Sequence, residues 1–226
     1  MNWTDFLRFA RGPLMGAALV VFAAGISYRL VRVVALGWSR GRAPARAADK
    51  TVGVLRTYLR GLGIFPFIPW VKQTFRGNAV TFLAGGLFHF GLLVIVFLGT
   101  AHMLVWKSLL GFGWPTVALP IIDGLAAATI VAMVALLINR LTHPVLRRLS
   151  GTSEFANLIV VFLPMLTGWI MAHHLWFRYE VIFGLHVASV ALLLVWIPFS
   201  RLSHFVFYFF SRTSHGIEFG KRGVTP

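Results

Sequence analysis

Five apolar stretches limit the folds that are open to this chain, because each is about as long as the 20 residues that a helix needs to cross a bilayer. They cover residues 13–34, 79–106, 115–139, 154–174 and 179–200. Hydrophobic residues make up 58% of the 226 residues and charged residues only 12%, which is typical of a membrane protein. Since backbone polar groups inside lipid must be paired within the protein, we predict an all-α, integral membrane five-helix bundle. Residues 1–226 are predicted to form a single membrane domain.

The net charge of +15 is distributed unevenly between the two ends of these predicted helices. Seventeen of the 21 lysines and arginines lie near the end of the first stretch (Arg29 and Arg32) or after the first, third or fifth stretch, and four lie at the opposite ends. By the positive-inside rule, the N-terminus is expected outside, and the C-terminus and the loop 37–78 in the cytoplasm. The distribution of charge therefore indicates the membrane topology and not nucleic-acid binding. The basic residues could in addition bind anionic lipid or a partner protein. We predict a multi-pass protein of the bacterial cytoplasmic (inner) membrane.

The long loop has two parts. Residues 37–50 are rich in Arg, Ala, Gly and Pro and are predicted to be irregular. Residues 52–70 mix arginines with aliphatic and aromatic residues and predict an amphipathic helix, broken at 65–69, that either lies on the membrane or docks a soluble partner. Further along, Thr152 or Ser153 is the predicted N-cap of the fourth helix, with Glu154 near its positive end.

Four histidines lie in or beside two of the apolar stretches. His89 and His102 belong to the second, and His186 and His204 to the fifth and its continuation. A histidine inside a membrane is costly without a partner, and neutral imidazole is a good axial ligand of haem iron. His186 and His204 are 18 residues apart, so on one continuous helix they would share a face about 27 Å apart. The 13 residues between His89 and His102 are not a whole number of turns, so helix tilt, different ring rotamers or a local distortion near Gly91 and Gly99 would have to reconcile their directions.

Depth in the membrane predicts how these histidines pair, because the second and fifth helices run in opposite directions. His89 and His204 are expected to share an inner iron, and His102 and His186 an outer iron. The chain has no cysteine, so histidines alone would hold two bis-histidine b-type haems, and iron–sulfur clusters would belong to another subunit. Three glycines near the ligands (Gly91, Gly99 and Gly184) would make room for porphyrin. Arg201 would pair with a propionate or mark the membrane boundary.

Other polar residues have open interpretations. Asp123 is either a proton acceptor near a quinone or an acid with local hydrogen bonds. His173 and His174 either line a quinol site or belong to an interfacial aromatic belt. His143 and His215 are expected to be solvated. Two different function classes remain as alternatives: a transporter with a histidine proton relay, and a membrane metal-dependent lipid enzyme.

The chain resembles the cytochrome b (gamma) subunit of respiratory nitrate reductase, and its relatives in Dsr-type, heterodisulfide-reductase-like complexes. The motifs that carry the resemblance are Leu87-Phe88-His89-Phe90-Gly91, Gly99-Thr100-Ala101-His102 and Pro198-Phe199-Ser200-Arg201-Leu202-Ser203-His204, within residues 78–207. It implies a dihaem subunit that passes electrons between the quinone pool and a cytoplasmic iron–sulfur partner subunit. The interval between the two histidines of the second helix is longer here than in the nitrate reductase subunit, which favours a divergent relative.

Overall fold

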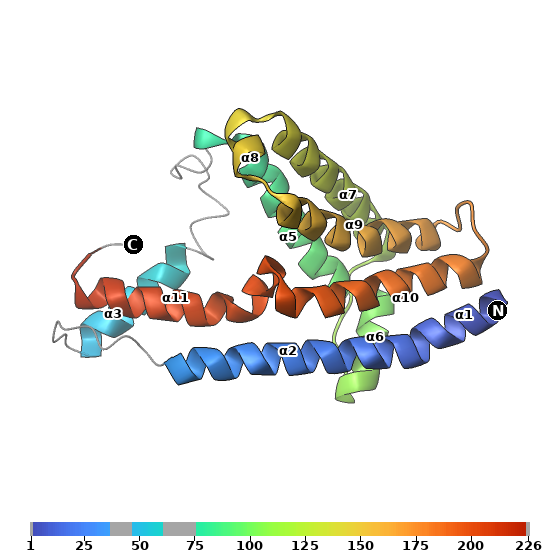
Figure 1. The fold of residues 1–226 in the computed structure, drawn as a ribbon, viewed down its shortest axis with the longest axis horizontal. Helices are drawn as coiled ribbons and strands as arrows, with labels where there is room; N and C mark the ends of the chain where they lie inside the picture. The colour runs from blue at the N-terminus through green and yellow to red at the C-terminus, as the bar shows by residue number, and fades with distance from the viewer. Residues whose placement is uncertain (1, 37–46, 61–75, 225–226) are drawn as a thin grey trace. The chain divides into compact units, whose positions relative to one another are not determined.

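The structure is a computed structural model that describes residues 2–36, 47–60 and 76–224. Within these ranges every regular element is a helix (Figure 1), which confirms the all-α prediction. Part of the predicted amphipathic segment 52–70, including its expected break at 65–69, lies outside the described residues.

Five helical stretches among the described residues are long and apolar enough to cross a membrane. They are Trp3–Leu36, Ala79–Leu98, Leu119–Thr142, Thr152–Ala172 and Tyr179–Phe199. The first consists of α1 (Trp3–Phe9), a π-helical turn η1 (Ala10–Leu14) that accommodates Pro13, and α2 (Met15–Leu36). The others contain α5 (Ala79–Leu98), α7 (Leu119–Thr142), α9 (Thr152–Ala172), and α10 (Tyr179–Trp196) with a 3-10 turn η4 (Ile197–Phe199). The chain is a multi-pass membrane protein.

The chain divides into two compact units by its internal contacts. The first unit comprises residues 1–19 and 74–194, and the second comprises residues 20–73 and 195–226. Both α2 and α10 continue from one unit into the other.

In the first unit, a polar cluster joins the N-terminus of α5 to the C-terminal part of α7. Asn78 caps α5 by accepting from the backbone N–H of Thr81 (2.8 Å). The side-chain amide of Asn139 donates to the side-chain oxygen (Oδ1) of Asn78 (3.1 Å) and to the Thr81 hydroxyl (2.9 Å). The two helices are therefore antiparallel. They pack closely further along, because Gly91 of α5 has no side chain where Thr129 of α7 lies.

The start of α9 differs by one position from the prediction. Gly151, not Thr152 or Ser153, is the N-cap, and the carboxylate of Glu154 accepts from its backbone N–H (2.9 Å). Glycine is a tolerated N-cap, and the carboxylate supplies the bond to a terminal N–H. The expected place of Glu154 at the positive helix end is correct.

In the second unit, α3 (Ala47–Tyr58) crosses α11 (His204–Lys221) in close contact (Figure 1). Gly216 and Gly220 lie one turn apart on α11, and a side chain on either would overlap the backbone of α3. A side chain on Gly53 of α3 would likewise overlap the Gly216 carbonyl oxygen. Small residues four apart permit such an approach of two backbones. The Tyr58 hydroxyl adds a bond to the Phe209 carbonyl oxygen (3.0 Å).

These contacts correct the sequence-based description of the loop. Residues 47–50, expected to be irregular, already belong to α3, and one face of this helix packs on α11 instead of being free for lipid or for a partner. The segment around His215, expected to be a solvated tail, is likewise helical, although the His215 side chain is exposed. The sequence signal for this packing was the spacing of Gly216 and Gly220.

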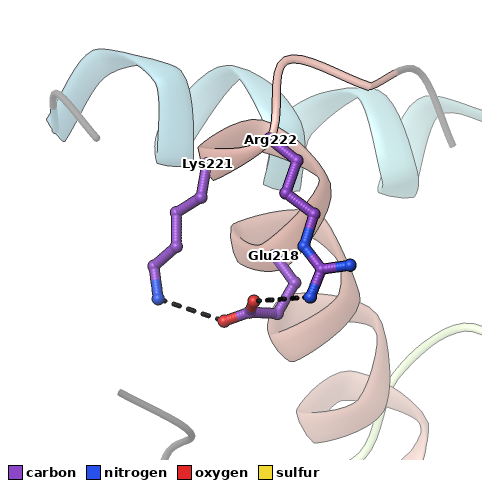
Figure 2. Close-up of polar contacts among 3 residues, drawn as sticks. All are labelled: Glu218, Lys221 and Arg222. Atoms are coloured by element: carbon purple, nitrogen blue, oxygen red, sulfur yellow. Dashed lines mark hydrogen bonds and ion pairs between the residues drawn. The ribbon is translucent and has the colours of Figure 1, made fainter. Parts of the chain in front are cut away.

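The end of α11 carries a small charge cluster. Figure 2 shows the carboxylate of Glu218 between two cations, with the Lys221 amine at 3.0 Å and the Arg222 guanidinium at 3.8 Å. Cations at a helix C-terminus interact favourably with its dipole. Because the Arg222 side chain is 70% exposed, its long pair with Glu218 contributes little to stability.

Candidate functional site

The first unit brings together two of the four predicted ligands. The imidazole rings of His102 and His186 have centroids 6.3 Å apart and planes at 63°. With metal–nitrogen bonds of about 2.0 Å and about 1.1 Å from nitrogen to centroid, two axial imidazoles on one iron have centroids about 6.2 Å apart. Their planes are free to differ by rotation about the shared axis. The separation of the two rings is therefore compatible with two imidazoles that would bind one haem iron.

The orientation of His186 is set by α9. Its Nδ1–H donates to the Pro164 carbonyl oxygen (3.1 Å), and the Thr167 hydroxyl lies 3.3 Å from the same nitrogen. Thr167 also hydrogen-bonds the Ser189 hydroxyl (3.2 Å), which donates to the His186 carbonyl oxygen (2.7 Å). A histidine that ligates a metal usually uses its other ring nitrogen in this way, because the bond fixes the tautomer and the ring orientation. Nε2 of His186 is thus the atom suited to bind iron.

A glycine of α9 makes room for this ring. A Cβ on Gly168 would lie 3.0 Å from Cε1 of His186, closer than ordinary contact allows. Two of the three glycines predicted to make room for porphyrin have other neighbours. Gly91 faces Thr129, and a Cβ on Gly184 would lie 2.5 Å from the Phe6 ring. No signal in the sequence distinguishes Gly168 from the other glycines of the apolar stretches.

His102 lies directly after a break in the second predicted span. The expected helix 79–106 is not continuous: α5 ends at Leu98, Gly99 is extended, and α6 (Thr100–Leu110) begins after it. A Cβ on Gly99 would lie 2.5 Å from the Ile95 carbonyl oxygen, so glycine fits the bend. The predicted distortion near Gly99 is confirmed, and it places His102 in the first turn of α6.

All four final carbonyl groups of α5 have partners despite the break. Gly99 N–H donates to Ile95 (3.1 Å) and Val117 N–H to Leu98 (2.9 Å). The indole N–H groups of Trp106 and Trp114 donate to the remaining two, those of Val96 (2.9 Å) and Phe97 (2.6 Å). Unpaired carbonyls in lipid would cost several kcal/mol each. The two tryptophans and Val117 therefore allow a helix to end inside an apolar stretch.

The chain is also interrupted before His204, which corrects the predicted geometry of the fifth span. After α10 come η4, an extended Ser200 (φ −124°, ψ 176°), and a second 3-10 turn, η5 (Arg201–Ser203); His204 then starts α11. Pro198 lacks the N–H that a continuing helix needs. The expectation that His186 and His204 share one face of a continuous helix over five turns is therefore wrong.

Arg29 of α2 holds this interruption within the second unit. One of its guanidinium nitrogens lies 2.9 Å from the Pro198 carbonyl oxygen, 3.2 Å from that of Ser200 and 2.6 Å from the Ser203 hydroxyl. The guanidinium carbon also lies 5.3 Å from the centroid of the Phe207 ring. From the sequence, Arg29 was expected only to be one of the cytoplasmic charges, and this role was not predicted. The position of Arg29 within an apolar stretch was the sequence signal that could have indicated this role.

The other predicted site residues are described by their local contacts. Nδ1 of His89 donates to the Gly85 carbonyl oxygen (2.7 Å), and Nδ1 of His204 to that of Arg201 (3.0 Å). His173 makes the same kind of bond to the Trp169 carbonyl oxygen (2.9 Å), so this local contact does not by itself mark a ligand. The pairing of His89 with His204 and that of Arg201 with a propionate stay predictions.

Clusters of three or more metal-binding side chains are absent from the ranges that the structure describes. A bis-histidine haem takes only two protein ligands on each iron, so the pair of His102 and His186 is sufficient for one.

One relative is a protein of Nitratidesulfovibrio vulgaris (strain Hildenborough), whose description, "Protein", names no activity. It is 27% identical to this chain over 219 residues, which cover 95% of this chain and 94% of the relative. No protein-family profile and no solved structure matches the chain. The chain is similar to a bacterial protein of nearly the same extent.

Proposed function

We propose that this chain is the dihaem b subunit of a bacterial respiratory complex in the cytoplasmic membrane, with His102 and His186 as the axial ligands of its outer haem. It would carry electrons between the quinone pool and an iron–sulfur partner subunit on the cytoplasmic side, in a complex of the nitrate reductase gamma or Dsr type. The observation that carries the proposal is the ring separation of His102 and His186, at a distance that suits two axial ligands of one iron.

Several features of the chain support this assignment of roles. The Pro164 carbonyl and the Thr167 hydroxyl orient His186, and Gly168 leaves its ring space. The break at Gly99 brings His102 to the start of a helix, where it meets a histidine of another span. The cofactor supplies reversible one-electron chemistry when bound, and the protein supplies ligands, spacing and an apolar surrounding. His89 and His204 would hold the second, inner haem.

A haem count on purified variants tests both the ligands and their pairing. The full-length protein, solubilised in detergent, should contain two haems in a pyridine haemochrome assay and show a sharp reduced α band. Each single substitution His89→Ala, His102→Ala, His186→Ala or His204→Ala should remove one haem. The double variant His102→Ala/His186→Ala should also lose one, whereas His102→Ala/His204→Ala should lose both.

His215→Ala is the matched control, because His215 is an exposed histidine of α11 that the proposal does not use. It should keep both haems. Two haems retained in His186→Ala would refute the ligand assignment, and one haem retained in His102→Ala/His204→Ala would refute the pairing. A wild-type protein without any haem would refute the function itself.

A further inference from the structure

A contact between a histidine and a carboxylate lies at the predicted outer end of the first unit, between the start of α7 and the end of α9. Nε2 of His173 is 3.2 Å from Oδ1 of Asp123. Asp123 lies in the second turn of α7, near its positive end, and His173 is the C-cap of α9, at its negative end. The side chains are 33% and 41% exposed, so a proton held there has a route to water.

The hydrogen bonds of His173 fix how many protons this pair holds. Its Nδ1–H donates to the Trp169 carbonyl oxygen (2.9 Å), which is an acceptor only. A hydrogen bond between Nε2 and the Asp123 carboxylate then needs one further proton, held either by the imidazole or by the acid. The pair can therefore take up one proton and release it, while the Trp169 carbonyl keeps the ring in place.

Trp169 connects this pair to the surroundings of His186. Its ring lies 4.3 Å from that of His173, and its indole N–H is buried without a hydrogen-bond partner among the described residues. A buried donor without a partner is energetically costly, and an oxygen of a bound ligand would offset that cost. The preceding residue, Gly168, contacts the His186 ring. His173 follows Thr167 by six residues, or about 9 Å along α9.

We propose that His173 and Asp123 form the proton-accepting pair for oxidation of a hydroquinone, with the Trp169 indole N–H donating to one of its oxygens. This inference rests on the proposed function. Oxidation of one hydroquinone breaks two O–H bonds and yields a quinone, two protons and two electrons. The pair takes one proton as a new N–H or O–H bond and passes it to the outer aqueous phase. The second proton would go to water directly, and the two electrons would be taken up by the two haems that the proposed ligands would hold.

Stopped-flow reduction of the bound haem by duroquinol tests the pair. In Asp123→Asn and in His173→Gln we expect the rate to fall about 100-fold, the size of a typical general-base contribution. The double variant should be no slower than either single variant, since the pair acts as a unit. Asp123→Glu, which keeps the carboxylate, should restore the rate to within a few-fold of wild type. Reduction by dithionite and the haem content should not change in any variant.

His174→Gln is the control, because His174 is the neighbouring exposed histidine and lies outside the pair. Rates in Asp123→Asn and His173→Gln that equal the wild-type rate would overturn the inference and leave the haem proposal intact. So would an equal loss in His174→Gln, or a loss in Asp123→Asn that Asp123→Glu does not restore. A wild-type protein that dithionite reduces but duroquinol does not would overturn the proposed function as well.

Discussion

Replacing Arg29 should destabilise the interruption that precedes His204. One nitrogen of its guanidinium faces two backbone carbonyl oxygens and the Ser203 hydroxyl. In Arg29→Gln the carbonyl groups of Pro198 and Ser200 lose a charged donor at a point where the helical hydrogen bonds are already interrupted. The Ser203 hydroxyl keeps its bond to the Ser200 carbonyl oxygen (2.9 Å), so the interruption weakens without losing every contact.

The size of the effect follows from the number of hydrogens. A terminal guanidinium nitrogen carries two hydrogens, so the three contacts amount to about two hydrogen bonds from a charged donor, at about 1.5–3 kcal/mol each. Because the guanidinium is only partly buried, we take the lower end, about 3 kcal/mol in total. Each 1.4 kcal/mol is a factor of ten, so local opening should become about 100-fold more frequent.

Hydrogen exchange of the peptide 197–204, followed by mass spectrometry in detergent, measures this opening directly. The backbone N–H groups of Ser200, Leu202 and Ser203 bond within the interruption and should exchange about 100-fold faster in Arg29→Gln. Arg32→Gln is the matched control, because Arg32 lies one turn further along α2 and contacts the Tyr28 ring instead. Equal exchange in Arg29→Gln and Arg32→Gln would refute the reasoning. If His204 binds haem, Arg29→Gln should also release that haem at a lower temperature.

Three further substitutions test the packing of the first unit, and thermal unfolding in detergent measures the stability of each variant. The control variant is Gly86→Ala, because no atom lies within 4 Å of a Cβ added at this site on α5. Gly91→Ala should cost about 1–3 kcal/mol because its Cβ overlaps Thr129, whereas Gly86→Ala should be neutral or stabilising; equal midpoints would contradict this. Asn139→Leu should cost about 1–3 kcal/mol by removing the hydrogen bonds between α5 and α7, and an unchanged midpoint would show that they contribute little. Gly168→Ala should shift the haem α band or midpoint potential by moving the adjacent imidazole, with stability close to that of the control, and an unchanged spectrum and potential would place its Cβ away from any ligand.

The fold class and the spans could be predicted from the sequence because lipid imposes few solutions. Helix length and apolar content identify a membrane helix without knowledge of its neighbours. The predicted stretches 115–139 and 154–174 accordingly match α7 and α9 within a few residues. The first helix begins earlier than predicted, at Trp3, and the capping box of Asn2 and Asp5 is the signal that marks this start.

The candidate site was predictable in its residues but only partly in its geometry. His102 and His186 could be paired because antiparallel helices place them at similar depths, and the structure brings their rings together. Residues whose role depends on a single tertiary contact could not be recognised as easily from the sequence. Gly168 is important because of where the ring of His186 lies, and Arg29 because of carbonyl groups about 170 residues away in sequence. Such roles depend on tertiary packing, which periodicity along one helix does not contain.

The two helix interruptions explain how two of the proposed ligands, His102 and His204, are positioned. His102 and His204 both lie in the first turn of a new helix. His102 follows the extended Gly99 closely, and His204 follows the 3-10 turn η5, which comes after the extended Ser200. In lipid, each interruption is stable only if the carbonyl groups that it releases find donors, and side chains supply several of them: Trp106 and Trp114 after α5, and Arg29 after α10. The positions of the proposed ligands therefore depend on residues that are not themselves proposed ligands. It follows that a substitution such as Trp106→Phe, which removes one donor, should disturb His102 more than an apolar substitution of similar size elsewhere on α6.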